Sequence, residues 1–192
     1  MEKLLYIDAC FRENESRTRR IAAPVVEALK NRYDVETINL NDLELIPVMS
    51  DEIAKRLGGK PSKESLEWAN KVKNADRIVI AAPFWDMSIP SALKVFIELC
   101  SIFDVTFTSD DKTCYGLCKC KKLLFITTRG MNIPTGDVRE QATSYLKALS
   151  TLWNLGELEV IARQNFDYLP AAIIEKEIQS AIAEGIEMTK TF

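Results

Sequence analysis

The sequence predicts an α/β fold in which a parallel sheet of five strands is covered by helices on both faces, forming a three-layer sandwich. Short, nearly continuous apolar runs alternate with longer segments of helical spacing, which is the pattern of parallel strands joined by helical crossovers. The length of 192 residues suits one well-buried domain. Because no repeat, low-complexity segment or linker divides the chain, we expect residues 1–192 to form a single domain.

Five apolar runs are the predicted strands. The third reads Arg-Ile-Val-Ile-Ala-Ala, as expected of a strand buried on both faces. The predicted strands are residues 3–8, 35–40, 77–82, 122–127 and 157–162.

The predicted helices have apolar residues three or four positions apart. In the first helix, Ile21, Val25 and Leu29 would share one side, and Ser62 is a suitable N-cap for the second. The predicted helices are residues 16–32, 62–74, 91–100, 137–154 and 171–190, and residues 41–61 and 104–121 are expected to be irregular connections.

Composition and charge exclude several classes of function. A net charge of -3 argues against a general nucleic-acid binder, which needs clustered Lys and Arg. No apolar run approaches the length of a membrane span, and Asp8 interrupts the N-terminal run too early for a signal peptide. Histidine is absent, which excludes Ser–His and Cys–His catalytic pairs. We therefore expect a cytoplasmic protein with no nucleic-acid or membrane partner.

The cysteines give a competing signal. Their odd number, five, favours thiols over a disulfide framework. Cys114, Cys118 and Cys120, with Cys100 as a fourth ligand, would suit zinc or an iron–sulfur cluster, but their spacing matches neither usual motif. Cys118 and Cys120 would point the same way if they lie on a strand. We predict no metal site and interpret this segment as a β-like excursion with incidental thiols.

Three loops that follow predicted strands should meet at one edge of the sheet, because ligands bind at the carboxyl ends of parallel strands. In the first loop, residues 9–17, Ser16 stands at a helix start where free N–H groups and the helix dipole favour a phosphate. Arg12 and Arg17 would add positive charge. The alternative is that Ser16 only caps the helix.

The second and third loops suggest a flat ring. Residues 83–87 read Pro-Phe-Trp-Asp-Met, and aromatic and methionine side chains suit contact with a conjugated ring. Alternatively, the two aromatic residues close the sheet end or form a subunit contact. In the third loop, Gly130 would allow close backbone approach or a positive φ, and Arg129 would stabilise negative charge on a reduced ring. An ordinary turn with a solvated Arg129 is the alternative.

These loops resemble those of the FMN-dependent NADH-azoreductase and NADH:quinone oxidoreductase family, which has a flavodoxin-like fold. The matching segments are residues 16–18, 82–94 and 127–131, and 105–107 and 116–117 also fit. The resemblance runs from residue 3 to about 165 in the same order. The chain departs from the family pattern at Cys10, where Ser is usual, at Trp85-Asp86, where Tyr-Asn is common, and at Met131-Asn132, where Gly and often His stand.

The resemblance implies an FMN enzyme that takes electrons from NADH or NADPH and passes them to quinones or azo compounds in ping-pong order. It also implies a homodimer, in which Phe107 would roof the acceptor pocket. A flavodoxin-like electron carrier and a non-enzymatic domain that has lost FMN are the alternatives, although carriers are typically more acidic. The predicted cofactor-binding residues are Cys10, Ser16, Arg17, Thr18, Pro83, Phe84, Trp85, Asp86, Met87, Thr128, Arg129, Gly130 and Met131.

Overall fold

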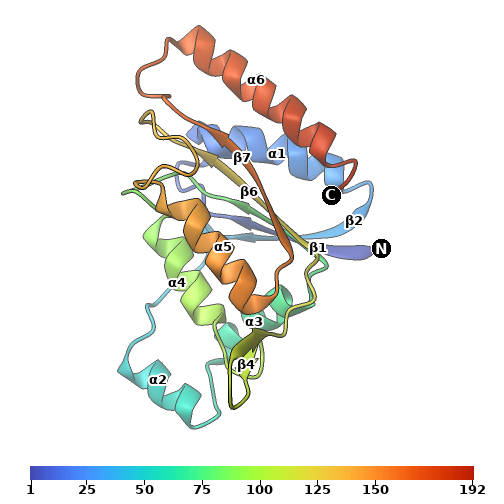
Figure 1. Cartoon of the computed structure of the whole chain (residues 1–192), viewed down its shortest axis with the longest axis vertical. Coiled ribbons are helices and arrows are strands. Elements are labelled where there is room, and N and C mark those ends of the chain that lie inside the picture. The colour runs from blue at the N-terminus through green and yellow to red at the C-terminus, as the bar shows by residue number, and fades with distance from the viewer.

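A computed structural model describes all of residues 1–192 and contains a sheet of five parallel strands in the order β2-β1-β3-β6-β7 (Figure 1). The chain runs outward from β1 to β2 and then crosses to β3 on the other side of β1. The connection after β1 leads to a helix on one face of the sheet, and the connection after β3 leads to a helix on the other face. The gap between these two connections is a topological switch point, where ligands bind in such sheets. The strands are β1 (Glu2–Asp8), β2 (Tyr33–Asn39), β3 (Arg77–Ala81), β6 (Lys122–Thr128) and β7 (Glu157–Arg163).

Helices cover both faces of the sheet, which confirms the three-layer sandwich. Helices α1 (Arg17–Leu29) and α6 (Ala171–Met188) lie together on one face (Figure 1). The other face carries α3 (Lys63–Asn74), α4 (Ser91–Cys100) and α5 (Gln141–Trp153). None of the helices is long and apolar enough to cross a membrane.

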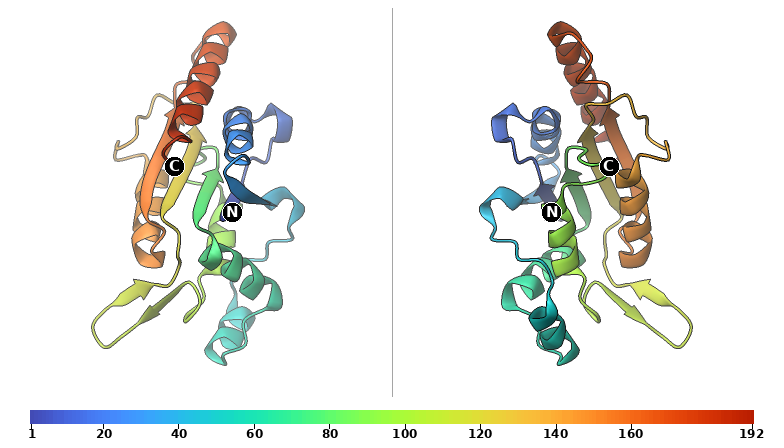
Figure 2. Two further views of the ribbon diagram at one scale, coloured as in Figure 1. Left: turned by 90° about the vertical axis from the view of Figure 1, so that its right-hand side faces the viewer. Right: turned by 90° about the vertical axis from the view of Figure 1, so that its left-hand side faces the viewer.

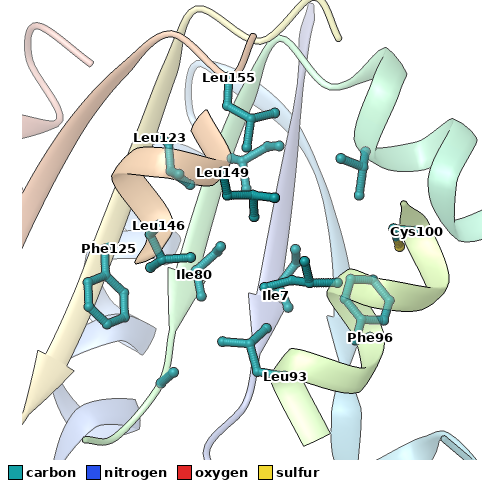
Figure 3. Close-up of a cluster of buried hydrophobic side chains, with 14 of the residues drawn as sticks. Ile7, Ile80, Leu93, Phe96, Cys100, Leu123, Phe125, Leu146, Leu149 and Leu155 are labelled. Carbon is teal, nitrogen blue, oxygen red and sulfur yellow. The ribbon is translucent and has the colours of Figure 1, made fainter. Parts of the chain in front are cut away.

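Each strand contributes to two apolar cores, one on each face. On β1, Leu5 and Ile7 belong to the core under α3, α4 and α5, whereas Leu4 and Tyr6 belong to the core under α1 and α6. Figure 3 shows part of the first core, where Ile7 and side chains of β3 and β6 face α4 and α5. Burial on both faces explains why the three central strands, β1, β3 and β6, read as continuous apolar runs.

The connection at residues 41–61 contains a helix that we did not predict, α2 (Ser50–Leu57). None of its residues is buried, and its eight residues carry only one apolar pair at helical spacing, Ile53 and Leu57, which is too short a pattern to indicate a helix. Arg56 attaches this helix to the end of α4, where its guanidinium donates to the carbonyls of Glu98, Leu99 and Ser101 at 3.0 Å. Short 3-10 helices also occur at Glu13–Glu15 and Leu40–Asp42.

The second connection, residues 104–121, contains an antiparallel hairpin of β4 (Phe107–Ser109) and β5 (Cys114–Gly116). Figure 2 shows the hairpin and α2 projecting from the end of the molecule opposite α6. The β-like excursion is therefore confirmed, but Cys118 and Cys120 lie beyond β5, so they share no strand face. Both are buried, and burial raises the pKa of each thiol to about 12. No three cysteine or acidic side chains form a group that could hold a metal ion.

Helix α5 begins four residues later than predicted. Glu140 is its N-cap and accepts the N–H of Thr143 at 2.9 Å. Before it, the carboxylate of Asp137 accepts the N–H of Arg139 at 2.9 Å and pairs with its guanidinium. This local turn competes with helical hydrogen bonding and delays the helix start.

Candidate functional site

The three predicted loops line one cavity of about 190 Å³ at the carboxyl edge of the sheet. They meet because β1, β3 and β6 are adjacent and parallel, so their ends share one edge. Three further wall residues, Arg12, Glu15 and Asp167, carry charge. The wall includes eight of the predicted cofactor residues, namely Ser16, Arg17, Thr18, Pro83, Phe84, Trp85, Thr128 and Gly130.

The start of α1 offers an anion site on this wall. Ser16 caps the helix, and its Oγ accepts the N–H of Arg19 at 3.2 Å. Arg17 and Thr18 open the helix and have no carbonyl of their own helix within reach of their N–H groups. Capping and anion binding are therefore compatible here, because Ser16 uses one N–H and leaves two at the positive end of the helix.

Thr128 fixes the three loops relative to one another. Its Oγ1 lies 2.7 Å from Oγ1 of Thr18 in a buried hydrogen bond, and its carbonyl accepts the N–H of Phe84 at 3.1 Å. The end of β6 is therefore attached to both neighbouring loops. The Thr18 hydroxyl is used in this contact, which leaves its N–H as the group available to a ligand.

Cys10 does not lie on the cavity wall, contrary to our prediction. Its side chain is buried, and Sγ points to the carbonyl of Ala81 at 3.6 Å. Burial, with a smaller contribution from Asp8, raises the pKa of this thiol to about 12. The Cys10 N–H donates to Oδ1 of Asp8, whose Oδ2 lies 2.8 Å from Nε of Arg19. Cys10 thus supports the loop from beneath, because its small apolar thiol fits the core.

The two aromatic residues of the second loop have different environments. Phe84 is buried, and the Arg129 guanidinium lies 5.7 Å from its ring centroid. Trp85 is 43% exposed and packs at the cavity mouth against Phe11, with ring centroids 5.9 Å apart. Phe84 forms the base of the loop, whereas Trp85 presents an open ring surface that a flat ligand can cover.

A tight turn shapes the rest of the second loop. Two backbone hydrogen bonds join Trp85 and Ser88, at 3.0 and 2.9 Å. The residues between them, Asp86 and Met87, have φ values of 48° and 65°, which non-glycine residues rarely adopt. Such strain is often found at ligand sites. The Met87 carbonyl accepts the N–H of Gln141, which attaches the turn to α5 at 3.0 Å.

A larger cavity of about 750 Å³ lies on the other side of Trp85. It runs between the second loop and the first turns of α4 and α5. Asp86 is on this wall and not on that of the smaller cavity, so it lies on the side away from the anion site. Trp85 contributes to both walls and therefore separates the two cavities. The wall consists of Trp85, Asp86, Ser88, Ile89, Ser91, Lys94, Gln141, Ser144 and Tyr145.

Arg129 is fully buried, which corrects the expectation that its side chain would face a ring or solvent. The guanidinium donates to the carbonyl of Ile133 and to Oγ1 of Thr135, both at 2.9 Å, and lies 3.7 Å from the Glu140 carboxylate. Burial lowers the pKa of Arg129, and the Glu140 charge opposes this shift. Arg129 therefore holds the third loop together from inside.

Gly130 allows the Asp167 side chain to approach the backbone closely, and the φ of Gly130 is not positive. A Cβ at this position would lie 1.9 Å from Oδ2 of Asp167. Asp167 follows β7 and was not among the predicted site residues. The rule that placed the other loops could have indicated it, since it also lies beyond the carboxyl end of a strand.

The remaining predicted residues do not contribute to the small cavity. Met87 and Met131 are partly exposed beside it but not on its wall. Phe107 lies on β4 and packs edge-on against Phe103, with centroids 5.8 Å apart. It lies on neither of the two cavity walls next to Trp85.

The strand order and the loop cavity at the switch point define a flavodoxin-like protein. The chain belongs to the family described as having the flavodoxin-like fold, whose model matches residues 2–186. It is 30% identical over 203 residues to the FMN-dependent NADH:quinone oxidoreductase of Caldicellulosiruptor bescii and 28% identical over 200 residues to that of Clostridium perfringens. Both alignments cover the whole of each chain.

The structure is also similar to the crystal structure of an FMN-dependent NADH-azoreductase from Bacillus anthracis in complex with FMN. The TM-score is 0.85 and the sequence identity is 23%, with 100% of this chain and 99% of the other covered. This likeness supports the fold assignment.

Proposed function

We propose that this protein is an FMN-dependent oxidoreductase that takes electrons from NADH and reduces quinones or azo compounds. The observation that carries this proposal is the single cavity in which the start of α1 and Arg17 lie beside the open ring of Trp85. The start of α1 suits a phosphate, and the open ring of Trp85 suits a flat ring that would extend beyond this small cavity. The relatives named above, which the chain matches over its whole length, support the same conclusion.

The donors present fit FMN. Arg17 and the N–H groups of Arg17 and Thr18 are suited to hold the phosphate. The Gly130 carbonyl accepts the N–H of Asp167 at 2.9 Å, whereas the Gly130 N–H has no partner within the chain and can donate to the polar edge of the ring. FMN, when bound, supplies the redox chemistry, so the absence of histidine is no obstacle.

The chain itself would bind the flavin, orient it and shield one side of its ring from water. Trp85 would cover one side of the ring and exclude water there. The Thr128 hydrogen bonds keep the phosphate end and the ring end at a fixed separation. Following the family resemblance, the nicotinamide donor and the acceptor would occupy the same open face in turn.

An absorbance titration tests the proposed function. The purified protein should bind FMN at one equivalent, show a flavin band, lose that band when NADH is added without oxygen, and regain it with a quinone. Replacing NADH by NADPH in the same titration measures donor preference. A protein that does not bind added FMN contradicts the proposal, and one that binds FMN without reacting with NADH would favour an electron carrier.

We also propose that the protein acts as a homodimer, with Phe107 reaching the acceptor pocket of a second copy. Phe107 lies on neither cavity wall of its own chain's site, which supports a role in the site of a second copy. A partly open apolar cavity between α4 and α5, lined in part by Ile97, Leu149 and Leu152, supports a contact face there. A cytoplasmic location stays a prediction from the sequence.

Sedimentation velocity tests the dimer. Leu152→Arg should convert the dimer to a monomer because it places a charge on this apolar cavity, and Leu152 is exposed enough for the fold to tolerate the change. Ile173→Arg on α6, on the opposite face of the sheet and similarly exposed, is the matched control and should stay dimeric. A monomeric wild-type protein would contradict the dimer.

A further inference from the structure

The wall of the small cavity carries two acidic side chains beside its two arginines. Glu15 pairs with Arg12 from the same loop, with 3.1 Å between Oε2 and Nη2. Asp167 lies 150 residues from Arg17 in the sequence, and its Oδ1 is 3.5 Å from Nη1 of Arg17. Each arginine that an anion would use therefore already faces a carboxylate.

The chain holds both members of the Arg17–Asp167 pair in place. The Asp167 N–H donates to the Gly130 carbonyl at 2.9 Å, and its Oδ2 occupies the space that a side chain at Gly130 would fill. The Arg17 guanidinium lies over the ring of Phe166, 5.5 Å from the centroid. The third loop therefore holds the Asp167 backbone with its carboxylate beside Gly130, and an aromatic face supports the guanidinium.

A flavin phosphate would be a stronger partner for Arg17 than Asp167 is. The pair is partly exposed and long, and pairs of this kind are weak. A phosphate can form charge-assisted hydrogen bonds with a guanidinium while it accepts the N–H groups of α1. Binding would replace the pair and leave the Asp167 carboxylate close to the phosphate. The resulting like-charge repulsion acts only on a ligand that carries the phosphate.

We propose that Asp167 is a specificity-determining residue of the flavin site, which competes with the flavin phosphate for Arg17. It thereby weakens the binding of FMN but not of riboflavin, which has the same ring and ribityl chain without the phosphate. This inference rests on the proposed flavin site. The protein would therefore prefer FMN over riboflavin by a smaller factor than it would without Asp167. When no phosphate is bound, Asp167 would neutralise the charge of Arg17.

Flavin fluorescence quenching can measure the Kd values of FMN and riboflavin for four proteins at low salt: wild type, Asp167→Asn, Arg17→Ala and the double variant. Asp167→Asn should bind FMN about fivefold more tightly and leave the riboflavin Kd unchanged. The gain should shrink at high salt, which screens exposed charges. In the Arg17→Ala background, the same substitution should give a clearly smaller gain. Asp34→Asn, an exposed change of equal charge at the start of β2, is the control and should change neither Kd.

Three results would overturn the inference. If Asp167→Asn leaves the ratio of the two Kd values unchanged, Asp167 does not act on the phosphate. If it weakens both flavins, Asp167 instead holds the ribityl hydroxyls. If the gain is the same without Arg17, there is no competition for that guanidinium. Wild-type protein that binds neither flavin would contradict the proposed function itself, which is a distinguishable result.

Discussion

Trp85 provides the exposed ring surface on which the proposed flavin site depends. It separates the two cavities and keeps nearly half of its surface open to solvent, while its neighbour Phe84 is buried. The indole packs against Phe11, and its exposed surface can contact a second flat ring. The usual family residue at this position, tyrosine, has a smaller ring.

We expect Trp85→Ala to raise the Kd for FMN about tenfold, because stacking of aromatic rings contributes on the order of 1 kcal/mol beyond the area that it buries. Trp85→Tyr should restore most of the affinity. Isothermal titration calorimetry measures both. An unchanged Kd for Trp85→Ala would show that the ring does not lie against this residue.

A second residue-scale prediction concerns the buried Arg129–Glu140 pair. Glu140→Gln keeps a side-chain acceptor for the N–H of Thr143 but leaves the Arg129 charge without a counter-charge. It should lower the free energy of unfolding by about 3 kcal/mol in urea. Combining it with Arg129→Met removes both charges, so the double variant should lose less than the sum of the single losses. Additive losses would show that the pair does not interact.

At the scale of elements, the end of α5 joins the hairpin segment to the sheet. Asn154 ends the helix with a φ of 61°, and its side-chain amide donates to the Cys118 carbonyl at 3.0 Å. Gly116 on β5 lies so close to Trp153 that an added Cβ would be 2.0 Å from its carbonyl carbon. The helix end and the hairpin are therefore positioned together.

We expect Asn154→Ala to lower the free energy of unfolding by about 2 kcal/mol, because it loses a hydrogen bond and replaces asparagine, which tolerates the left-handed region, by alanine, which tolerates it less well. Asn154→Gly should lose only about 1 kcal/mol, since glycine adopts this conformation freely. Urea unfolding separates the two contributions. Equal losses would mean that the backbone conformation costs nothing here.

At the scale of the whole molecule, the site is made of loops that four strands bring to one edge of the sheet. The ligand would therefore contact segments from the start, middle and end of the chain. A ligand that binds only the folded state stabilises the whole domain by mass action. The site and the global stability are thus linked, and Phe84 belongs both to the cavity wall and to one of the two cores.

FMN at a hundred times its Kd should raise the free energy of unfolding by about 2.7 kcal/mol and the melting temperature by about 8 °C. Differential scanning calorimetry gives the shift. Adenosine monophosphate, which has a phosphate but no flavin ring, is the control and should give a much smaller one. Equal shifts for the two ligands would show that the anion site alone is responsible.

The sequence predicted the parts of the fold that rest on burial. The three central strands bury both faces and the packed helices bury one, so each leaves an apolar signal in the sequence. Helix α2 has only one exposed apolar pair at helical spacing, Ile53 and Leu57, which is too short a pattern to indicate it. The late start of α5 is set by the Asp137 turn and leaves no apolar signal. The same distinction applies to the site. Loops could be assigned to the sheet edge because each follows a predicted parallel strand, but the direction of each side chain could not be predicted.

The sequence by itself determined the sandwich and the edge at which the loops meet, since these follow from apolar periodicity. From the residue types of the loops it also predicted a site for a phosphate and a flat ring. Only the tertiary structure decided which side chains line the cavity. Cys10 and Arg129 are turned into the interior, and Asp167 is brought to Arg17 from the far end of the chain. Contacts between distant segments depend on how the cores pack, and no local pattern encodes them.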